Sequence, residues 1–293
     1  MSAAPRAARR VPAHAVAGLA ILIGAESLLF AGFDPVRTFF TPIAWTGYIL
    51  LADGAVFSLT GRSQLTTNGA EFFRCAVLSI PIWLVFEAYN VRLKNWAYVG
   101  LPDALPLRLL GYGWSFATIL PALFETSDLL LALTRPRPRP SPAAGRDAEG
   151  ASPGTQVASF TFGGLCLALP LLVPPFIAPY LFGLVWIGFV FLLAPVSASL
   201  GRWSPFADSG HGGRARLVSL LVGGLACGLL WEFWNYWAGA RWIYTFPMFQ
   251  DRKIFEMPLA GFLGFPPFAV ECFLMYDLLA AAWGGGWGRP GRA

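Results

Sequence analysis

Eight long apolar stretches alternate with short polar segments along the chain. Each stretch is close to the roughly 20 residues that an α-helix needs to cross the hydrocarbon core of a bilayer. We therefore predict transmembrane helices near residues 13–33, 38–60, 70–91, 108–134, 157–175, 178–199, 215–238 and 257–283. This pattern is typical of an all-α integral membrane protein.

The polar segments carry Lys and Arg in an uneven distribution. If the N-terminus is inside, fourteen of these residues lie on cytoplasmic segments and seven on outer ones. The positive-inside rule then predicts two cytoplasmic termini and an even number of spans, as in a multi-pass protein of a bacterial inner (plasma) membrane. Arg6, Arg9 and Arg10 precede an apolar run as in a signal peptide, but Glu26 interrupts that run and no clear cleavage site follows, so we expect an uncleaved first helix.

One polar segment is much longer than the others. Residues 135–156 are rich in Pro, Gly, Ser and Ala and hold too few apolar side chains to form a core, which predicts a disordered cytoplasmic linker. This segment divides the chain into a first four-helix membrane half at 1–134 and a second at 157–293.

The two halves resemble each other in sequence. The matching segments are Trp45–Tyr48 with Trp186–Phe189, Gly61-Arg62 with Gly201-Arg202, Phe86–Asn90 with Trp231–Asn235, Asn95–Tyr98 with Arg241–Tyr244, and Phe116–Glu125 with Phe262–Glu271. Identical Trp, Glu, Asn, Tyr and Pro residues recur in the same order, which indicates an internal duplication. Because each half has an even number of helices, we predict parallel repeats related by an axis along the membrane normal, with a cavity between them.

The composition supports a membrane protein and narrows its chemistry. Hydrophobic residues make up 56% of the chain and charged residues 13%, against about a quarter charged in soluble domains. The net charge of +5 comes from short basic clusters between apolar runs, so we expect no nucleic-acid partner. Two His residues and four Cys without a CxxC pair indicate no metal site, no disulfide framework and no cofactor.

Carboxyl groups inside the predicted helices are the main candidates for chemistry, because they are costly in hydrocarbon and normally face a protein interior. Four of them, Glu26, Asp53, Asp128 and Asp277, have no repeat partner, and we expect local pairing or positions close to the interface. The other four form two repeat-related pairs, Glu87 with Glu232 and Glu125 with Glu271. These four are the predicted catalytic groups.

Glu87 and Glu232 are each followed by an Asn at i+3, so that Glu and Asn share one helix face. Aromatic residues surround both pairs, toward the outer leaflet. The predicted substrate-binding residues are Asn90, Asn235, Tyr89, Trp96, Trp231, Trp234, Trp242 and Tyr244. In an alternative interpretation, each Glu only accepts hydrogen bonds from Trp and Tyr of the opposite half, and the aromatic residues are interface anchors.

The end of the second half resembles the small membrane lycopene cyclases. The likeness covers about forty residues and consists of Trp242-Ile243-Tyr244, then Gly261, Gly264, Pro266-Pro267, Glu271 and Phe273. That family typically has adjacent acids directly after the proline, whereas this chain has a single Glu271 four residues on. The Trp231-Glu232 pair is similar to one in the membrane-bound terpene cyclases that act on meroterpenoids. Both resemblances imply a proton-donating Glu, at Glu232 and Glu271, that acts on an isoprenoid.

Three functions are consistent with these patterns. The first is a cofactor-independent membrane enzyme on an isoprenoid, carotenoid or other lipid, in which Glu groups act as acid and base and aromatic faces stabilise a cation, as in a cyclase or hydratase. The second is a transporter or carrier with a central carboxylate site. The third is a non-catalytic membrane scaffold subunit. Lipid or isoprenoid molecules and the surrounding membrane lipids are the expected partners.

Overall fold

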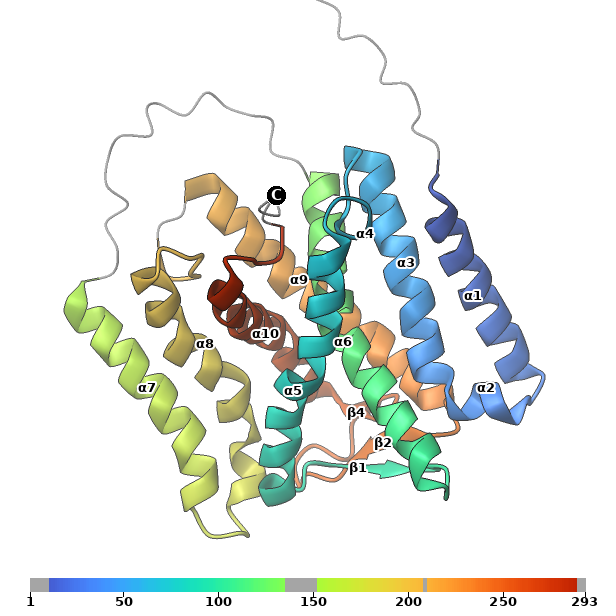
Figure 1. Cartoon of the computed structure of the whole chain (residues 1–293). Coiled ribbons are helices and arrows are strands. Elements are labelled where there is room, and N and C mark those ends of the chain that lie inside the picture. The colour runs from blue at the N-terminus through green and yellow to red at the C-terminus, as the bar shows by residue number, and fades with distance from the viewer. Residues whose placement is uncertain (1–10, 135–151, 208–209, 289–293) are drawn as a thin grey trace, which may run out of the picture.

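The structure is a computed structural model that describes residues 11–134, 152–207 and 210–288. Within these residues it has eight helices that are long and apolar enough to cross a membrane, which confirms the predicted all-α multi-pass fold (Figure 1). The long helices are α1 (Ala13–Phe30), α3 (Phe40–Thr60), α5 (Gly69–Leu93), α6 (Leu105–Thr134), α7 (Pro153–Leu172), α8 (Phe182–Ser199), α9 (Gly210–Trp237) and α10 (Phe265–Ala280).

Short elements connect and extend these helices. They are the helices α2 (Asp34–Thr38) and α4 (Gln64–Thr67), the 3₁₀ turns Ala178–Leu181, Leu259–Gly264 and Ala281–Trp283, and the strands β1 (Trp96–Val99), β2 (Arg241–Tyr244), β3 (Lys253–Ile254) and β4 (Met257–Pro258). The 3₁₀ turns extend the spans of α8 and α10, which is why the sequence pattern predicts these spans to begin earlier.

The predicted linker at 135–156 differs from the structure at its end. Residues 135–151 lie outside the described residues, but α7 already begins at Pro153. The Oγ atom of Ser152 accepts a hydrogen bond from the Thr155 backbone N–H at 3.3 Å, and proline is well suited to the first helical position. This helix start explains why the last four residues of the predicted linker are helical.

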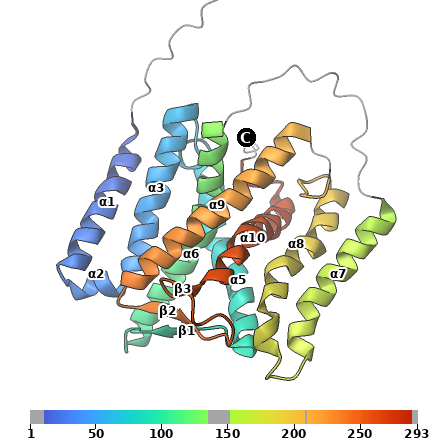
Figure 2. The same cartoon turned by 180° about the vertical axis from the view of Figure 1, so that it is seen from behind.

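The helices pack in a pattern that the two halves share. Helix α1 packs on α3 and α7 on α8, α3 packs on α6 and α8 on α10, and α5 and α9 pack on α6 and α10 respectively. Contacts between the halves also correspond, because α6 meets α9 and α5 meets α10. Figures 1 and 2 show α1 and α7 at opposite flanks, with α5, α6, α9 and α10 between them. This arrangement agrees with the predicted parallel repeat.

Matched glycines hold the flanking helix pairs together. A Cβ atom added at Gly18 would lie 2.5 Å from the carbonyl oxygen of Gly47, and one at Gly163 would lie 2.7 Å from that of Gly188. Small residues allow such close backbone approach between membrane helices. Since Gly47 and Gly188 occupy equivalent repeat positions, the duplication extends to the first helix of each half.

A two-stranded antiparallel ribbon, β1 with β2, joins the halves. The paired residues are Trp96 with Tyr244, Ala97 with Ile243, Tyr98 with Trp242, and Val99 with Arg241. Ala97 and Ile243 are equivalent repeat positions and face each other, so the two-fold axis passes between them. Figure 1 shows the ribbon at one end of the bundle. We call this the ribbon end, and the opposite end, where α1 begins and α10 finishes, the terminal end.

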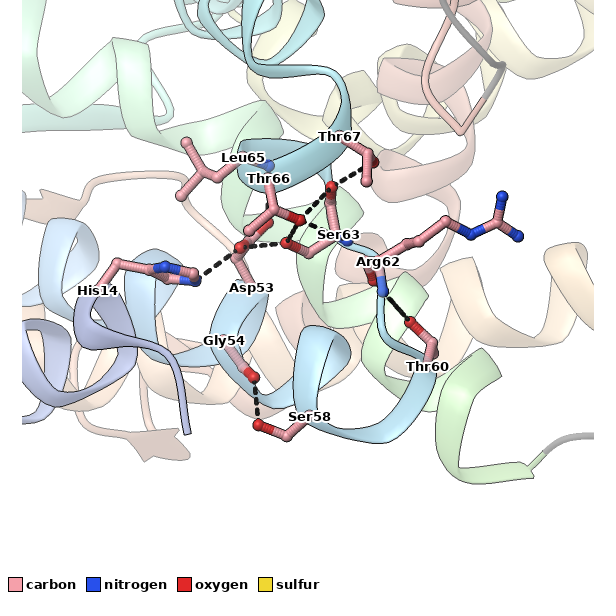
Figure 3. Close-up of polar contacts among 10 residues, drawn as sticks. All are labelled: His14, Asp53, Gly54, Ser58, Thr60, Arg62, Ser63, Leu65, Thr66 and Thr67. Atoms are coloured by element: carbon pink, nitrogen blue, oxygen red, sulfur yellow. Dashed lines mark hydrogen bonds and ion pairs between the residues drawn. The ribbon is translucent and has the colours of Figure 1, made fainter. Parts of the chain in front are cut away.

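At the terminal end, a buried carboxyl fixes the turn between α3 and α5 (Figure 3). Asp53 accepts hydrogen bonds from the Ser63 hydroxyl at 2.7 Å and from the Leu65 backbone N–H at 3.0 Å. The Nε2 atom of His14 on α1 lies 2.9 Å from the same carboxylate. Asp53 thus connects α1, α3 and the following turn, in agreement with the expected local pairing.

The other carboxyls without repeat partners are also paired. Asp277 accepts two hydrogen bonds from the Arg202 guanidinium, at 2.5 and 2.6 Å. Asp128 pairs with Arg216 at 2.6 Å, a residue of the other half. Glu26 likewise accepts a bond from the other half, from Trp234 Nε1 at 3.0 Å. The sequence pattern did not predict the Asp128–Arg216 and Glu26–Trp234 contacts, because each joins residues of different halves.

The ribbon pairing makes a direct prediction about crosslinking. In an Ala97→Cys/Ile243→Cys variant, the cysteines lie opposite each other at a separation compatible with a disulfide. After cleavage at a protease site placed within residues 136–150, the halves should remain joined on a non-reducing gel and separate on a reducing one.

The matched control is Val99→Cys/Thr245→Cys, because Val99 pairs with Arg241 and thus lies four residues out of register with Thr245. Equal crosslinking of the two double variants, or none in the Ala97 pair, would contradict the ribbon register.

Candidate functional site

A cavity of about 130 Å³ lies between the halves at the ribbon end. Its aromatic lining residues are Phe39, Trp45, Trp83, Trp96, Tyr98, Tyr112, Phe116, Phe182, Trp186, Trp231, Trp242, Tyr244, Phe265 and Phe268. An apolar cavity of about 150 Å³ can hold benzene. The cavity therefore has room for an apolar group of about that size, such as one end of a larger lipid.

Both halves supply equivalent parts of the cavity wall. The Trp45 ring contacts the Trp231 ring with a centroid separation of 5.0 Å. At the matching position, Trp186 stacks on Phe86 at 5.8 Å and meets Phe268 edge-on at 4.8 Å. The Trp45–Trp231 and Trp186–Phe86 contacts each pair a residue of one half with a residue of the other, so this part of the cavity wall exists only when the halves are assembled.

Glu232 lies behind this wall and is fully buried. Its Oε1 atom accepts hydrogen bonds from the Tyr244 hydroxyl at 2.7 Å and from Trp242 Nε1 at 3.4 Å. The Tyr244 hydroxyl itself accepts a bond from Trp242 Nε1 at 3.0 Å. Within the described residues, Glu232 Oε2 has no hydrogen-bond partner. The carboxyl thus reaches the cavity through Tyr244.

Glu87 has the equivalent place in the first half, with more donors around it. Its Oε1 atom accepts bonds from the Tyr98 hydroxyl at 2.5 Å, from Trp83 Nε1 at 2.9 Å and from Trp96 Nε1 at 3.2 Å. Glu87 is partly exposed, unlike Glu232. The third donor, Trp83, has no counterpart in the second half, where the matched residue is Gly228. The two carboxyl sites are therefore related but not equivalent.

The Asn residues at i+3 pin the strands to the helix ends. Asn235 donates to the Trp242 carbonyl at 2.8 Å and accepts from the Trp242 backbone N–H at 2.9 Å. Asn90 makes the same two bonds to Trp96, at 2.8 and 3.1 Å. Because Glu and Asn share a helix face, one helix positions both the backbone and the side chains of its strand. Neither Asn lines the cavity.

All these Glu and Asn contacts lie within one half. The alternative interpretation expected Glu87 and Glu232 to accept hydrogen bonds from Trp and Tyr of the opposite half. Their Trp and Tyr donors instead belong to the same half as each Glu. The halves meet instead through the ribbon and the facing rings. Each Glu therefore orients the aromatic wall of its own half, and the ribbon brings the two walls together.

Tyr98 and Tyr244 are the two lining tyrosines that lie on the ribbon and donate to a Glu carboxyl. Burial and the Glu87 carboxyl raise the pKa of Tyr98 well above its usual value, and burial and the Glu232 carboxyl do the same for the pKa of Tyr244. Both phenols therefore keep their protons at neutral pH and remain hydrogen-bond donors.

The other two predicted catalytic carboxyls lie deeper in the bundle. Glu125 and Glu271 are fully buried. Both oxygens of Glu271 lack a hydrogen-bond partner among the described residues, whereas the Glu125 carboxyl lies beside that of Asp53. Glu125 is six residues beyond Ile119 on α6, and Glu271 one turn beyond Phe268 on α10. Ile119 and Phe268 line the cavity, whereas none of the four predicted catalytic Glu residues does.

The predicted substrate-binding residues divide into two groups. Trp96, Trp231, Trp242 and Tyr244 line the cavity. Tyr89 and Trp234 do not, because Tyr89 donates to the Leu167 carbonyl at 3.1 Å and Trp234 donates to Glu26. These two side chains hold helices together.

Several lining residues were not among the predicted site residues. Trp45 and Trp186 line the cavity from different halves, and the repeat already marked them as equivalent tryptophans. Arg108 and Arg241 also line the cavity. Their sequence positions suggested only loop charges, because nothing in the pattern places a loop arginine beside an aromatic cavity.

Comparisons with known proteins place no constraint on this site. The chain gives no significant match to a protein-family model, to a curated protein or to a solved structure. Among the described residues, no group of three or more His, Cys, Asp or Glu side chains is arranged to hold a metal ion.

The contrast between satisfied and unsatisfied carboxyls predicts opposite stability changes. Glu271→Met removes buried oxygens without partners and should raise the free energy of unfolding by about 1 kcal/mol or more. The matched Glu232→Met leaves the donors of Tyr244 and Trp242 without their acceptor and should lower it by about 1–3 kcal/mol. Thermal unfolding in one detergent, followed by tryptophan fluorescence, measures both, and shifts of the same sign would contradict this assignment.

Proposed function

We propose that this chain is a membrane-embedded enzyme that acts on an isoprenoid, a carotenoid or another lipid by Glu-mediated acid–base chemistry. The observation that carries the proposal is the aromatic cavity between the halves, whose Tyr and Trp walls are hydrogen-bonded to Glu87 and Glu232. The predominantly apolar and aromatic lining suits a lipid substrate.

In this proposal Glu232 and Tyr244 form the proton-donating pair. Glu232 starts as the neutral acid. As Tyr244 passes its hydroxyl proton to a carbon–carbon double bond of the substrate, the carboxyl proton of Glu232 moves to the Tyr244 oxygen and leaves Glu232 as a carboxylate. The indole faces of the wall stabilise the resulting cation. Ring closure followed by return of a proton to the same pair gives an isomer of the substrate. Attack by water, whose surplus proton also returns to the pair, gives a hydrated product. Neither outcome needs an oxidant or reductant.

Glu87 is assigned a positioning role instead. Three donors converge on its Oε1 atom, so the carboxyl acts as an acceptor that holds Tyr98, Trp83 and Trp96 in place. Glu125 and Glu271 have no contact with the cavity, so the reaction is assigned to the wall nearest Glu232. A carrier is less well supported, because a carboxylate ion site would place carboxyls on the cavity surface.

The enzyme proposal predicts a lipid change that depends on the proton-donating pair. In cells that express the wild type, mass spectrometry of lipid extracts should show a new lipid, either of unchanged mass and shifted retention or heavier by one water. Glu232→Gln and Tyr244→Phe should each reduce its amount by about 100-fold, the usual contribution of a general acid.

Asp34→Asn is the matched control, because Asp34 is exposed and is not among the residues that line the cavity. Each variant is compared at equal amounts of folded protein in the membrane. An unchanged lipid profile between cells with and without the wild type would refute the enzyme proposal.

We also propose that the terminal end faces the cytoplasm of a bacterial plasma membrane. The support is the excess of Arg and Lys on the segments at that end, fourteen against seven.

Reporter fusions test this orientation. A fluorescent protein at the C-terminus should fluoresce, and alkaline phosphatase there should be inactive. Alkaline phosphatase inserted after Asp103, in the turn between β1 and α6, should be active. The reverse pattern would show that the ribbon end is cytoplasmic.

A further inference from the structure

Two arginines, one from each half, line the cavity in addition to the aromatic side chains. Arg108 lies in the first turn of α6, and Arg241 begins β2. Both are partly buried at the ribbon end. The rest of the lining consists almost entirely of aromatic, aliphatic and small side chains. The cavity therefore combines an apolar interior with positive charge near the membrane surface.

Arg108 is held in place without being neutralised. Its Nε and Nη2 atoms donate to the Pro102 carbonyl at 3.1 and 3.0 Å, and no carboxylate among the described residues forms an ion pair with it. Arg241 donates to the Tyr236 carbonyl at 3.0 Å, and its Nη2 atom lies 3.7 Å from Glu256. The pair carries more positive than negative charge, and the planar guanidinium matches the geometry of phosphate oxygens.

We propose that the cavity binds a lipid with a phosphate headgroup, with the phosphate at Arg108 and Arg241 and the adjoining apolar units among the aromatic rings. This inference rests on the proposed function and names the substrate class. The lining residues on α6 run from Leu107 to Ile119, which is about 18 Å of helix, so a headgroup at the surface and a buried tail segment both fit. The remainder of a longer tail extends into the bilayer.

Ligand binding to the purified full chain tests this proposal. The protein is placed in nanodiscs of digalactosyldiacylglycerol, a bilayer lipid without phosphate, and titrated with geranylgeranyl phosphate, with geranylgeraniol and with inorganic phosphate, while tryptophan fluorescence reports on the cavity. The variants are Arg108→Gln/Arg241→Gln and Arg108→Lys. The matched control is Arg252→Gln, which removes one exposed positive charge outside the lining.

The double variant should bind geranylgeranyl phosphate about tenfold more weakly than the wild type, because it loses charge-assisted hydrogen bonds. Its affinity for geranylgeraniol should change by less than about twofold, since a charge at the edge of a site matters little to a neutral ligand. Arg108→Lys should bind the phosphate lipid more tightly than the double variant, and Arg252→Gln should equal the wild type. Comparing variants for each ligand separately removes differences in how the two lipids partition into the bilayer.

Equal weakening for the phosphate lipid and the alcohol would overturn the proposal, as would an Arg252→Gln effect as large as that of the double variant. Saturation by inorganic phosphate at the concentrations at which geranylgeranyl phosphate binds would show a site for free phosphate instead. If both lipids bind with no dependence on the arginines, the headgroup assignment fails while the lipid cavity of the proposed function stands. If neither lipid binds, the proposed function fails with it.

Discussion

The pairing of β1 with β2 is the interaction on which the rest of this structure depends. In a bilayer, apolar surface gives little force to join two four-helix halves, so directional contacts and close packing have to do so. The ribbon supplies backbone hydrogen bonds around a two-fold axis between Ala97 and Ile243. Asn90 and Asn235 fix each strand to its own helix, and the facing aromatic walls are brought together as a consequence.

Three kinds of side chain follow one another from the ribbon end inward: arginines, the aromatic cavity lining, and buried carboxyls. Arginine lies at the ribbon end, aromatic rings with hydroxyl and indole donors line the cavity, and carboxyls stand behind the rings. The internal duplication gives the cavity two similar walls, one from each half. Sequence differences between the halves then give the two walls different proposed roles. Glu87 with its additional donor Trp83 suits positioning, while Glu232 with one unpaired oxygen suits proton transfer. An amphiphile with its headgroup at the arginines and its apolar part among the aromatic rings fits this order of side chains.

Hydropathy and the repeat predict much of the fold, because span length and side-chain order are local properties. They also place Glu and Asn on one face of α5 and α9. They do not predict the ribbon, since four-residue strands between helices leave no periodic pattern. They also give no sign that Glu71, at the start of α5, accepts a hydrogen bond from the Tyr276 hydroxyl of the other half at 2.6 Å, because only the fold brings these two residues together. The position of each carboxyl behind the cavity wall, and not on its surface, depends on the rotation of helices against their neighbours.

We propose that the assembled halves enclose a lipid-binding cavity. A cryo-electron microscopy map of the protein in nanodiscs made from its host membrane tests this most directly. We expect elongated density between Trp45 and Trp186 that reaches the arginines at the ribbon end and continues into the bilayer. Walls in direct contact with no density between them, or isolated water-sized peaks in an open channel, would contradict the claim.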